Sequence, residues 1–178
     1  GGNSDGIATA KNCADDAAAG SNLCIGNVLR NNIVFDNADD GFDLSFADSI
    51  VERNISFYNG PKGMRGYKVL RNVKNINWIG NIAFGNPGPG FEPRNESGQV
   101  YYHNLAVAND GNGFTFVSSG IGDASNNMSL NNANSDADVN GNGLLTLSNN
   151  WFADGSMGQN SGDPSLVNPG VVIDTNFP

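Results

Sequence analysis

The dominant pattern in this sequence is a short alternation of apolar and smaller residues enclosed by two asparagines. The enclosing asparagines lie five positions apart in pairs at Asn32/Asn37, Asn54/Asn59, Asn81/Asn86, Asn104/Asn109 and Asn127/Asn132, and a partial sixth unit begins at Asn150. Between them apolar residues take alternate positions, as Ile33 and Phe35 do in the first unit. Period-two alternation predicts a short β-strand, and the intervening stretches rich in Asn, Gly and Asp predict turns.

The leading asparagines recur at spacings of 22, 27, 23, 23 and 23 residues. Short strands with this period predict an all-β fold, a parallel β-helix solenoid whose coils of about 22–23 residues stack ~4.8 Å apart. In such a stack an interior asparagine can pair its amide with the coils above and below, which forms an asparagine ladder. A sandwich or barrel needs turn signals every ~8–12 residues. A leucine-rich repeat needs a leucine consensus that this sequence lacks.

Length and the ends of the chain set the expected domain organisation. A chain of 178 residues is long enough for one buried core, so we expect residues 1–178 to form a single β-helix domain. Residues 154–178 contain three prolines and are expected to cap the C-terminal end of the solenoid. The start at Gly1 without an initiator Met indicates a mature or truncated product, and whether N-terminal coils are missing stays open.

A second recurrent mark, glycine followed by an aromatic residue, begins four residues after the closing asparagine of a unit. It occurs at Gly41-Phe42, Gly90-Phe91 and Gly113-Phe114. The longer unit between Asn54 and Asn81 offers either Gly63-Met64-Arg65 or Gly66-Tyr67-Lys68. We favour the second, which keeps the aromatic residue and makes residues 60–65 a small inserted loop. In this register one column of successive coils contains Asp43, Lys68, Glu92 and Thr115.

Three carboxylates, Asp39, Asp40 and Asp43, lie within five residues of one another. Carboxylates this close repel and raise one another's pKa unless a cation is bound, and oxygen ligands of this kind suit Ca²⁺. Asp5-Gly6-Ile7 repeats the Asp-Gly-apolar mark of Asp40-Gly41-Phe42, which predicts that Asp5 lies one coil below the cluster. Solvated aspartates that cap turns are the simpler alternative.

Charge and cysteine content narrow the class of partner. With 18 acidic and 9 basic residues the formal charge is −9, which argues against nucleic acid and anionic lipid as ligands. An anionic ligand would need a bound cation to attract it. Cys13 and Cys24, the two cysteines, indicate either a disulfide of a secreted protein or two buried thiols. No window approaches ~20 apolar residues, so no membrane span is expected.

The acidic run from Asn37 to Leu44 resembles the core of the family 9 polysaccharide lyases, the pectate lyases of that family. Asp5-Gly6-Ile7 and Gly66-Tyr67-Lys68 carry the same likeness, which covers roughly residues 3 to 117. The resemblance implies a right-handed parallel β-helix that cleaves polygalacturonate by β-elimination. We expect a secreted monomer. It implies a catalytic Ca²⁺ held by Asp5, Asp39, Asp40 and Asp43, with Lys68 as the base.

The chemistry can be stated on physical grounds. Ca²⁺ on a uronate carboxylate neutralises it and stabilises the charge that develops when the adjacent C5 proton is removed. Lys68 can take that proton if its pKa is suitable; the aspartates raise this pKa while Ca²⁺ and Arg65 lower it, and the sequence does not decide which prevails. Arg65 is a competing base, and both Arg65 and Arg94 are candidates for binding substrate carboxylates.

Two other functions fit the same residues. One is a β-helix that binds calcium and polysaccharide without catalysis. The other is a lyase or epimerase acting on another uronan, such as alginate.

Overall fold

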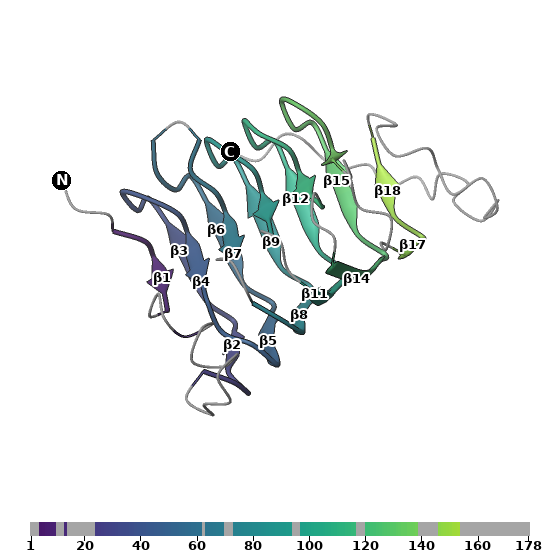
Figure 1. Cartoon of the computed structure of the whole chain (residues 1–178). Helices are drawn as coiled ribbons and strands as arrows, with labels where there is room; N and C mark the ends of the chain where they lie inside the picture. Colours follow the sequence, from purple (N-terminus) through teal and green to yellow (C-terminus); the bar gives the residue numbers. More distant parts are fainter. Residues whose placement is uncertain are drawn as a thin grey trace.

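The computed structural model describes residues 4–9, 13, 24–61, 63–69, 73–93, 97–116, 120–138 and 146–153. Its strands form three parallel sheets of six strands each, and successive coils of the chain stack side by side along one axis (Figure 1). The predicted β-solenoid is therefore confirmed. Arg94 and the predicted cap at residues 154–178 lie outside the described residues, so the expectation that residues 1–178 are one domain stays a prediction.

Each complete coil adds one strand to each sheet. Sheet 1 contains β1 (Ile7–Ala8), β4 (Phe42–Leu44), β7 (Tyr67–Val69), β10 (Phe91–Glu92), β13 (Phe114–Thr115) and β16 (Ala137–Asp138). Sheet 2 contains β2 (Val28–Arg30), β5 (Ser49–Glu52), β8 (Ile76–Ile79), β11 (Ser97–Tyr102), β14 (Gly120–Ser125) and β17 (Thr146–Ser148). Sheet 3 contains β3 (Ile33–Phe35), β6 (Ile55–Phe57), β9 (Ile82–Phe84), β12 (Leu105–Val107), β15 (Met128–Leu130) and β18 (Trp151–Phe152).

The enclosing asparagines form two ladders, one at each end of the sheet 3 strands. The first ladder contains Asn32, Asn54, Asn81, Asn104, Asn127 and Asn150, and the second contains Asn37, Asn59, Asn86, Asn109 and Asn132. After the first member of each ladder, every Oδ1 accepts the backbone N–H and a side-chain N–H of the asparagine in the preceding coil; for Asn81 and Asn54 these distances are 3.1 and 3.0 Å. The predicted ladder is thus present, and it satisfies buried backbone at both turns.

The residue before every ladder asparagine has a left-handed backbone. Asn31, Arg53 and His103 precede members of the first ladder with φ of 58°, 53° and 57°. This backbone conformation turns the chain sharply at a single residue. The asparagine after it and the inward side chains of the strand before it can therefore both point into the interior. His103 is therefore a turn residue.

The core is a stack of aromatic rings on the inner face of sheet 1. Tyr67 stacks on Phe42 and on Phe91 with ring centroids 4.6 and 4.7 Å apart, and Phe91 stacks on Phe114 at 4.8 Å. All four rings are buried, so the stack supplies much of the apolar area removed from water. Because Tyr67 is a member of this stack, Gly66-Tyr67-Lys68 is confirmed as the glycine–aromatic mark of the longer unit between Asn54 and Asn81.

The glycine of each mark is required by close contact between coils. A Cβ on Gly66 would lie 2.8 Å from the carbonyl oxygen of Gly90 and 2.8 Å from Nδ2 of Asn86 in the second ladder. Neither group can move without breaking the stack, because one is backbone and the other is hydrogen-bonded in the ladder. The glycine recurs because no side chain fits there.

Sheet 3 has its larger apolar residues outside and its smaller ones inside. The inward residues are Val34, Ser56, Ala83, Ala106 and Ser129. The outward residues form two parallel columns, which we call the apolar strip. The first column is Ile33, Ile55, Ile82, Leu105, Met128 and Trp151. The second column is Phe35, Phe57, Phe84, Val107 and Leu130. This orientation follows from the ladders, since an inward Asn32 puts Val34 inward and Ile33 and Phe35 outward.

Cys13 and Cys24 form a disulfide, which resolves the alternatives left by the sequence. Cys24 is buried against the core, with Cys13 packed beside it. Among the described residues no helix has the length and apolar character needed to cross a membrane.

Candidate functional site

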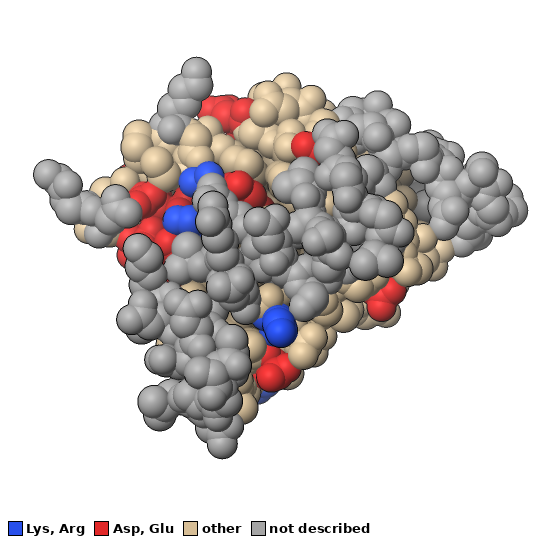
Figure 2. Space-filling view, in the orientation of Figure 1, with Lys and Arg blue, Asp and Glu red and all other residues tan. Residues whose placement is uncertain are grey.

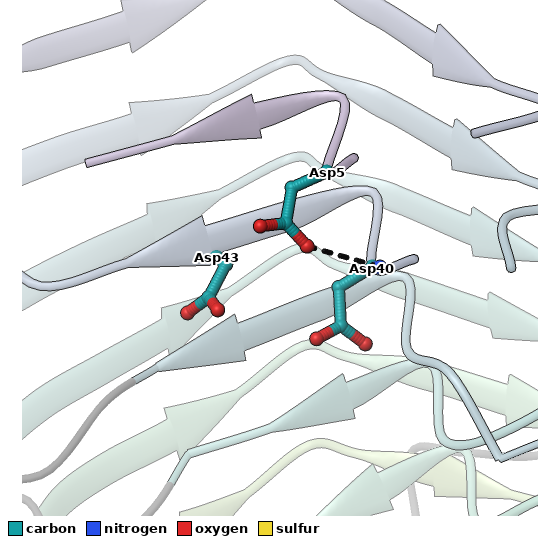
Figure 3. A group of neighbouring side chains, drawn as sticks. All are labelled: Asp5, Asp40 and Asp43. Atoms are coloured by element: carbon teal, nitrogen blue, oxygen red, sulfur yellow. Dashed lines mark hydrogen bonds between the residues drawn. The ribbon is translucent and has the colours of Figure 1, made fainter. Parts of the chain in front are cut away.

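Asp5, Asp40 and Asp43 come together from two successive coils at the start of sheet 1. β1 pairs in parallel with β4 so that Ile7 lies opposite Phe42, and Oδ1 of Asp5 accepts the backbone N–H of Asp40 at 3.1 Å. One carboxylate oxygen from each of the three residues lies within 4.8 Å of the others (Figure 3). The prediction that Asp5 lies one coil from the acidic cluster is confirmed.

Lys68 enters the same site from the next coil. It is the register partner of Asp43, and on its other side it is the partner of Glu92. Its Nζ donates to Oδ2 of Asp43 at 2.7 Å and to Oδ2 of Asp40 at 2.9 Å, and only 14% of its side chain is exposed. The predicted column of Asp43, Lys68 and Glu92 is therefore present on the outer face of sheet 1.

Arg65, from the inserted loop, completes the ring of charges. Its backbone N–H donates to Oδ1 of Asp40 at 2.7 Å, and its Nη1 lies 3.9 Å from the same oxygen. Its Nε donates to Oε2 of Glu92 in a close ion pair. Asp40 is fully buried and is the central acceptor of the site, contacting Asp5, Lys68 and Arg65.

The pKa values of Asp5 and Lys68 are shifted because the charged groups of the site lie close together. Burial raises the pKa of the Asp5 carboxyl, and the charges of Asp43, Asp39 and Asp40 raise it further. Burial alone would lower the pKa of the Lys68 amine, but its hydrogen bonds to Asp43 and Asp40 outweigh burial and raise that pKa. These hydrogen bonds stabilise the charged ammonium of Lys68.

Arg65 follows the same electrostatic logic. Burial would lower the pKa of its guanidinium, and the hydrogen bond and charge of Glu92 outweigh burial and raise it. Arg65 is therefore held as a cation, which suits a role in binding carboxylates and does not suit a role as a base.

Asp39 occupies a different position from the other three aspartates. Its side chain is buried, and its charge contributes to raising the pKa of Asp5 and Arg65. It is not a member of the close group formed by Asp5, Asp40 and Asp43 in the described part of the chain. Its role as a fourth metal ligand stays a prediction, and the same holds for Arg94 as a substrate-binding residue outside the described residues.

The carboxyl group of Asp43 has one buried oxygen, Oδ1, without a hydrogen-bond partner in the structure. An unpaired buried carboxylate oxygen costs free energy, and a cation bound beside it would remove that cost. The neighbouring donors are also carboxylate oxygens, the set that Ca²⁺ prefers. The residues present therefore fit an oxygen-seeking divalent cation.

The sequence predicted five of the residues that the structure brings together (Asp5, Asp40, Asp43, Lys68 and Arg65) but missed one connection. The ion pair of Arg65 with Glu92 was not foreseen, although the column register already placed Glu92 beside Lys68. The missing information was the path of the inserted loop, because nothing in residues 60–65 indicates which carboxylate Arg65 contacts.

Acidic and basic side chains gather near the N-terminal end of the solenoid, where β1 and β4 lie (Figure 2). Comparison of this chain with protein-family models, with curated proteins and with solved structures gives no match.

Proposed function

We propose that this protein is a secreted, Ca²⁺-dependent lyase that cleaves a polyuronate such as polygalacturonate by β-elimination. The observation that carries the proposal is the position of Lys68, whose amine lies within 2.9 Å of two carboxylates of the acidic cluster. A potential base directly beside a candidate metal site is the arrangement that proton abstraction from a metal-bound uronate requires. The likeness to family 9 polysaccharide lyases points the same way.

Asp5, Asp40 and Asp43 would hold the cation, with Asp39 as the fourth ligand that the resemblance suggests. Bound Ca²⁺ would neutralise the substrate carboxylate and so make the adjacent C5 proton more acidic. The disulfide between Cys13 and Cys24 is consistent with an oxidising, extracellular location.

Lys68 would act at the C5 proton of the uronate. In its uncharged form the amine takes the proton, the C5 electrons form the new double bond to C4, and the C4–O glycosidic bond breaks with its electrons on the leaving oxygen. Because Asp43 and Asp40 raise the pKa of Lys68, the uncharged amine is scarce at neutral pH. We therefore expect the rate to increase with pH into the alkaline range.

Arg65 would bind a carboxylate of the polysaccharide. Glu92 and Asp40 hold its guanidinium beside the column of Asp43 and Lys68, so its remaining N–H groups can receive an anionic sugar. Arg94, two residues after Glu92, is proposed for the same role at a neighbouring sugar.

The proposal is tested by incubating the protein with polygalacturonate and following the unsaturated product in the ultraviolet, with Ca²⁺ and with a chelator. We expect absorbance to increase with Ca²⁺ only, and Lys68→Met to abolish the increase. Lys74→Met is the matched control, because Lys74 is exposed and lies before sheet 2, where its backbone oxygen accepts the N–H of Asp48. Full activity of Lys68→Met would show that another residue acts as the base.

A non-catalytic calcium- and polysaccharide-binding protein is the second candidate. It is favoured by one observation: Lys68 is held as a charged partner of two aspartates, as in a structural ion pair. Parallel assays on alginate and other uronans distinguish the candidates. Calcium binding by calorimetry without product from any uronan would support the binding protein and refute the lyase.

A further inference from the structure

We propose that the apolar strip of sheet 3 is the contact surface of a homodimer. The strip consists of the outward residues of six adjacent strands, and each of these residues in the described chain is apolar. The other two sheets differ, since sheet 1 presents Asp43, Lys68 and Glu92 outward and sheet 2 presents Arg30 and Glu52. A continuous apolar face of this kind on one sheet alone marks an interaction surface.

The ring geometry of the strip argues against a carbohydrate as the occupant. Phe57 stacks face to face on Phe35 at 5.0 Å and on Phe84 at 4.6 Å, with interplanar angles of 6°. The rings therefore cover one another's faces and present their edges outward. A sugar ring packs on an exposed aromatic face, which a ring inside the column such as Phe57 does not offer.

The charge of the protein argues against an anionic lipid surface, because binding to such lipids requires an excess of Lys and Arg and the formal charge is −9. Strand addition is also excluded across the strip. The backbone groups of the inner strands β6, β9, β12 and β15 are paired with neighbouring strands on both sides. What the strip offers is packing of side chains against another flat apolar surface.

A second copy of the same strip matches this requirement in size and shape. Six strands and two columns give a face of about 30 Å by 14 Å, or about 400 Å² per copy. Two copies would bury about 800 Å², and the exposed ring of Tyr58 at the margin adds to it, which approaches the ~1,000 Å² of the smallest specific interfaces. We therefore expect a weak dimer that forms reversibly with concentration.

The size gradient along the strip selects one arrangement. Its second column begins with the bulky Phe35, Phe57 and Phe84 and ends with the smaller Val107 and Leu130. A two-fold axis along the strand direction would reverse one copy, so that the phenylalanine end of each copy packs on the aliphatic end of the other. Large residues then face small ones, which is the condition for close packing.

Sedimentation equilibrium of the full chain, from low micromolar to near-millimolar concentration, tests the proposal. We expect the wild type to change from monomer to dimer, and Phe57→Lys, which places a charge on the second strand of the strip, to weaken association at least tenfold. Val28→Lys is the matched control: Val28 is an exposed apolar residue on sheet 2, at 46% exposure, and its substitution should leave the dimer unchanged.

Leu105→Lys provides a second substitution within the strip, and far-UV circular dichroism checks that each variant is folded. A wild type that stays monomeric over the whole range would overturn the proposal. The same follows if a folded Phe57→Lys or Leu105→Lys variant dimerises as tightly as the wild type.

Discussion

Substitution of Asn81 by alanine should remove a large part of the stability of this fold. Asn81 lies in the middle of the first ladder and takes part in four side-chain hydrogen bonds. Its Oδ1 accepts the backbone N–H and a side-chain N–H of Asn54, and its Nδ2 donates to Val51 O at 2.7 Å and to Asn104 Oδ1 at 3.0 Å. The substitution leaves two buried donors of Asn54 without an acceptor.

The expected cost follows from those two donors. Each buried donor left without a partner costs about 1–3 kcal/mol, so Asn81→Ala should lower the free energy of unfolding by about 2–6 kcal/mol. This is a large share of the ~5–15 kcal/mol that stabilises an ordinary domain. With a urea m-value of about 2 kcal/mol/M, the unfolding midpoint should decrease by about 1–3 M.

Asn32→Ala is the matched control at the start of the same ladder. Asn32 donates to Asn54 Oδ1 and to Arg30 O, and in the described part of the chain no group donates to its Oδ1. It is partly exposed, so water can replace what is lost, and we expect a cost of about 1 kcal/mol or less. Urea unfolding followed by circular dichroism, with chelator in every sample, measures both variants. Equal decreases for Asn81→Ala and Asn32→Ala would refute the assignment of stability to the buried ladder.

Three further predictions concern packing, charge and the disulfide. Gly66→Ala should destabilise the protein by about 1–3 kcal/mol through steric conflict with the next coil, whereas Gly122→Ala, whose Cβ would lie no closer than 3.2 Å to a neighbour, should cost less in the same thermal melts. Burial and nearby carboxylates raise the pKa of Asp5 in the folded state, so the folded protein binds this proton more tightly than the unfolded chain. The penalty of ionised Asp5 is then lost as the pH falls, and in chelator the stability of the wild type relative to Asp5→Asn should increase on acidification from neutral pH; a decrease would contradict the raised pKa. Reduction of the Cys13–Cys24 disulfide, which joins residues 11 apart, should cost about 3 kcal/mol, and an unchanged urea midpoint after reduction would contradict this.

The repeat made most of the fold predictable from sequence. Asparagine can satisfy a donor and an acceptor in adjacent coils at once, so its recurrence at constant spacing indicates stacking. The same repeat fixed the register of Lys68, because an aromatic ring at that level was needed to continue the stack of Phe42 and Phe91. These inferences succeed because neighbouring coils impose the same constraint on equivalent positions.

Two features could not be read in this way. The alternation in sheet 3 alone defines two faces without saying which is inside. The ladder asparagines decide it, and the left-handed residues such as Asn31 that turn them inward carry no unique sequence signature. The contacts of Arg65 depend on an inserted loop that occurs in one coil, so no equivalent position elsewhere in the chain constrains it. A sequence repeat predicts only the structure that all coils share. The contacts of Arg65 come from a loop found in one coil, so the repeat does not predict them.

The ladders also make the coil an interchangeable unit. In every step the carbonyl oxygen of one amide accepts from the asparagine before it, and its own amide donates to the asparagine after it. A copied segment of 23 residues from Asn81 to His103, inserted before Asn104, would therefore meet a matching acceptor ahead and a matching donor behind. Solenoids of this type can lengthen or shorten by whole coils without leaving an unmatched amide, which gives gene duplication a direct route to longer binding faces.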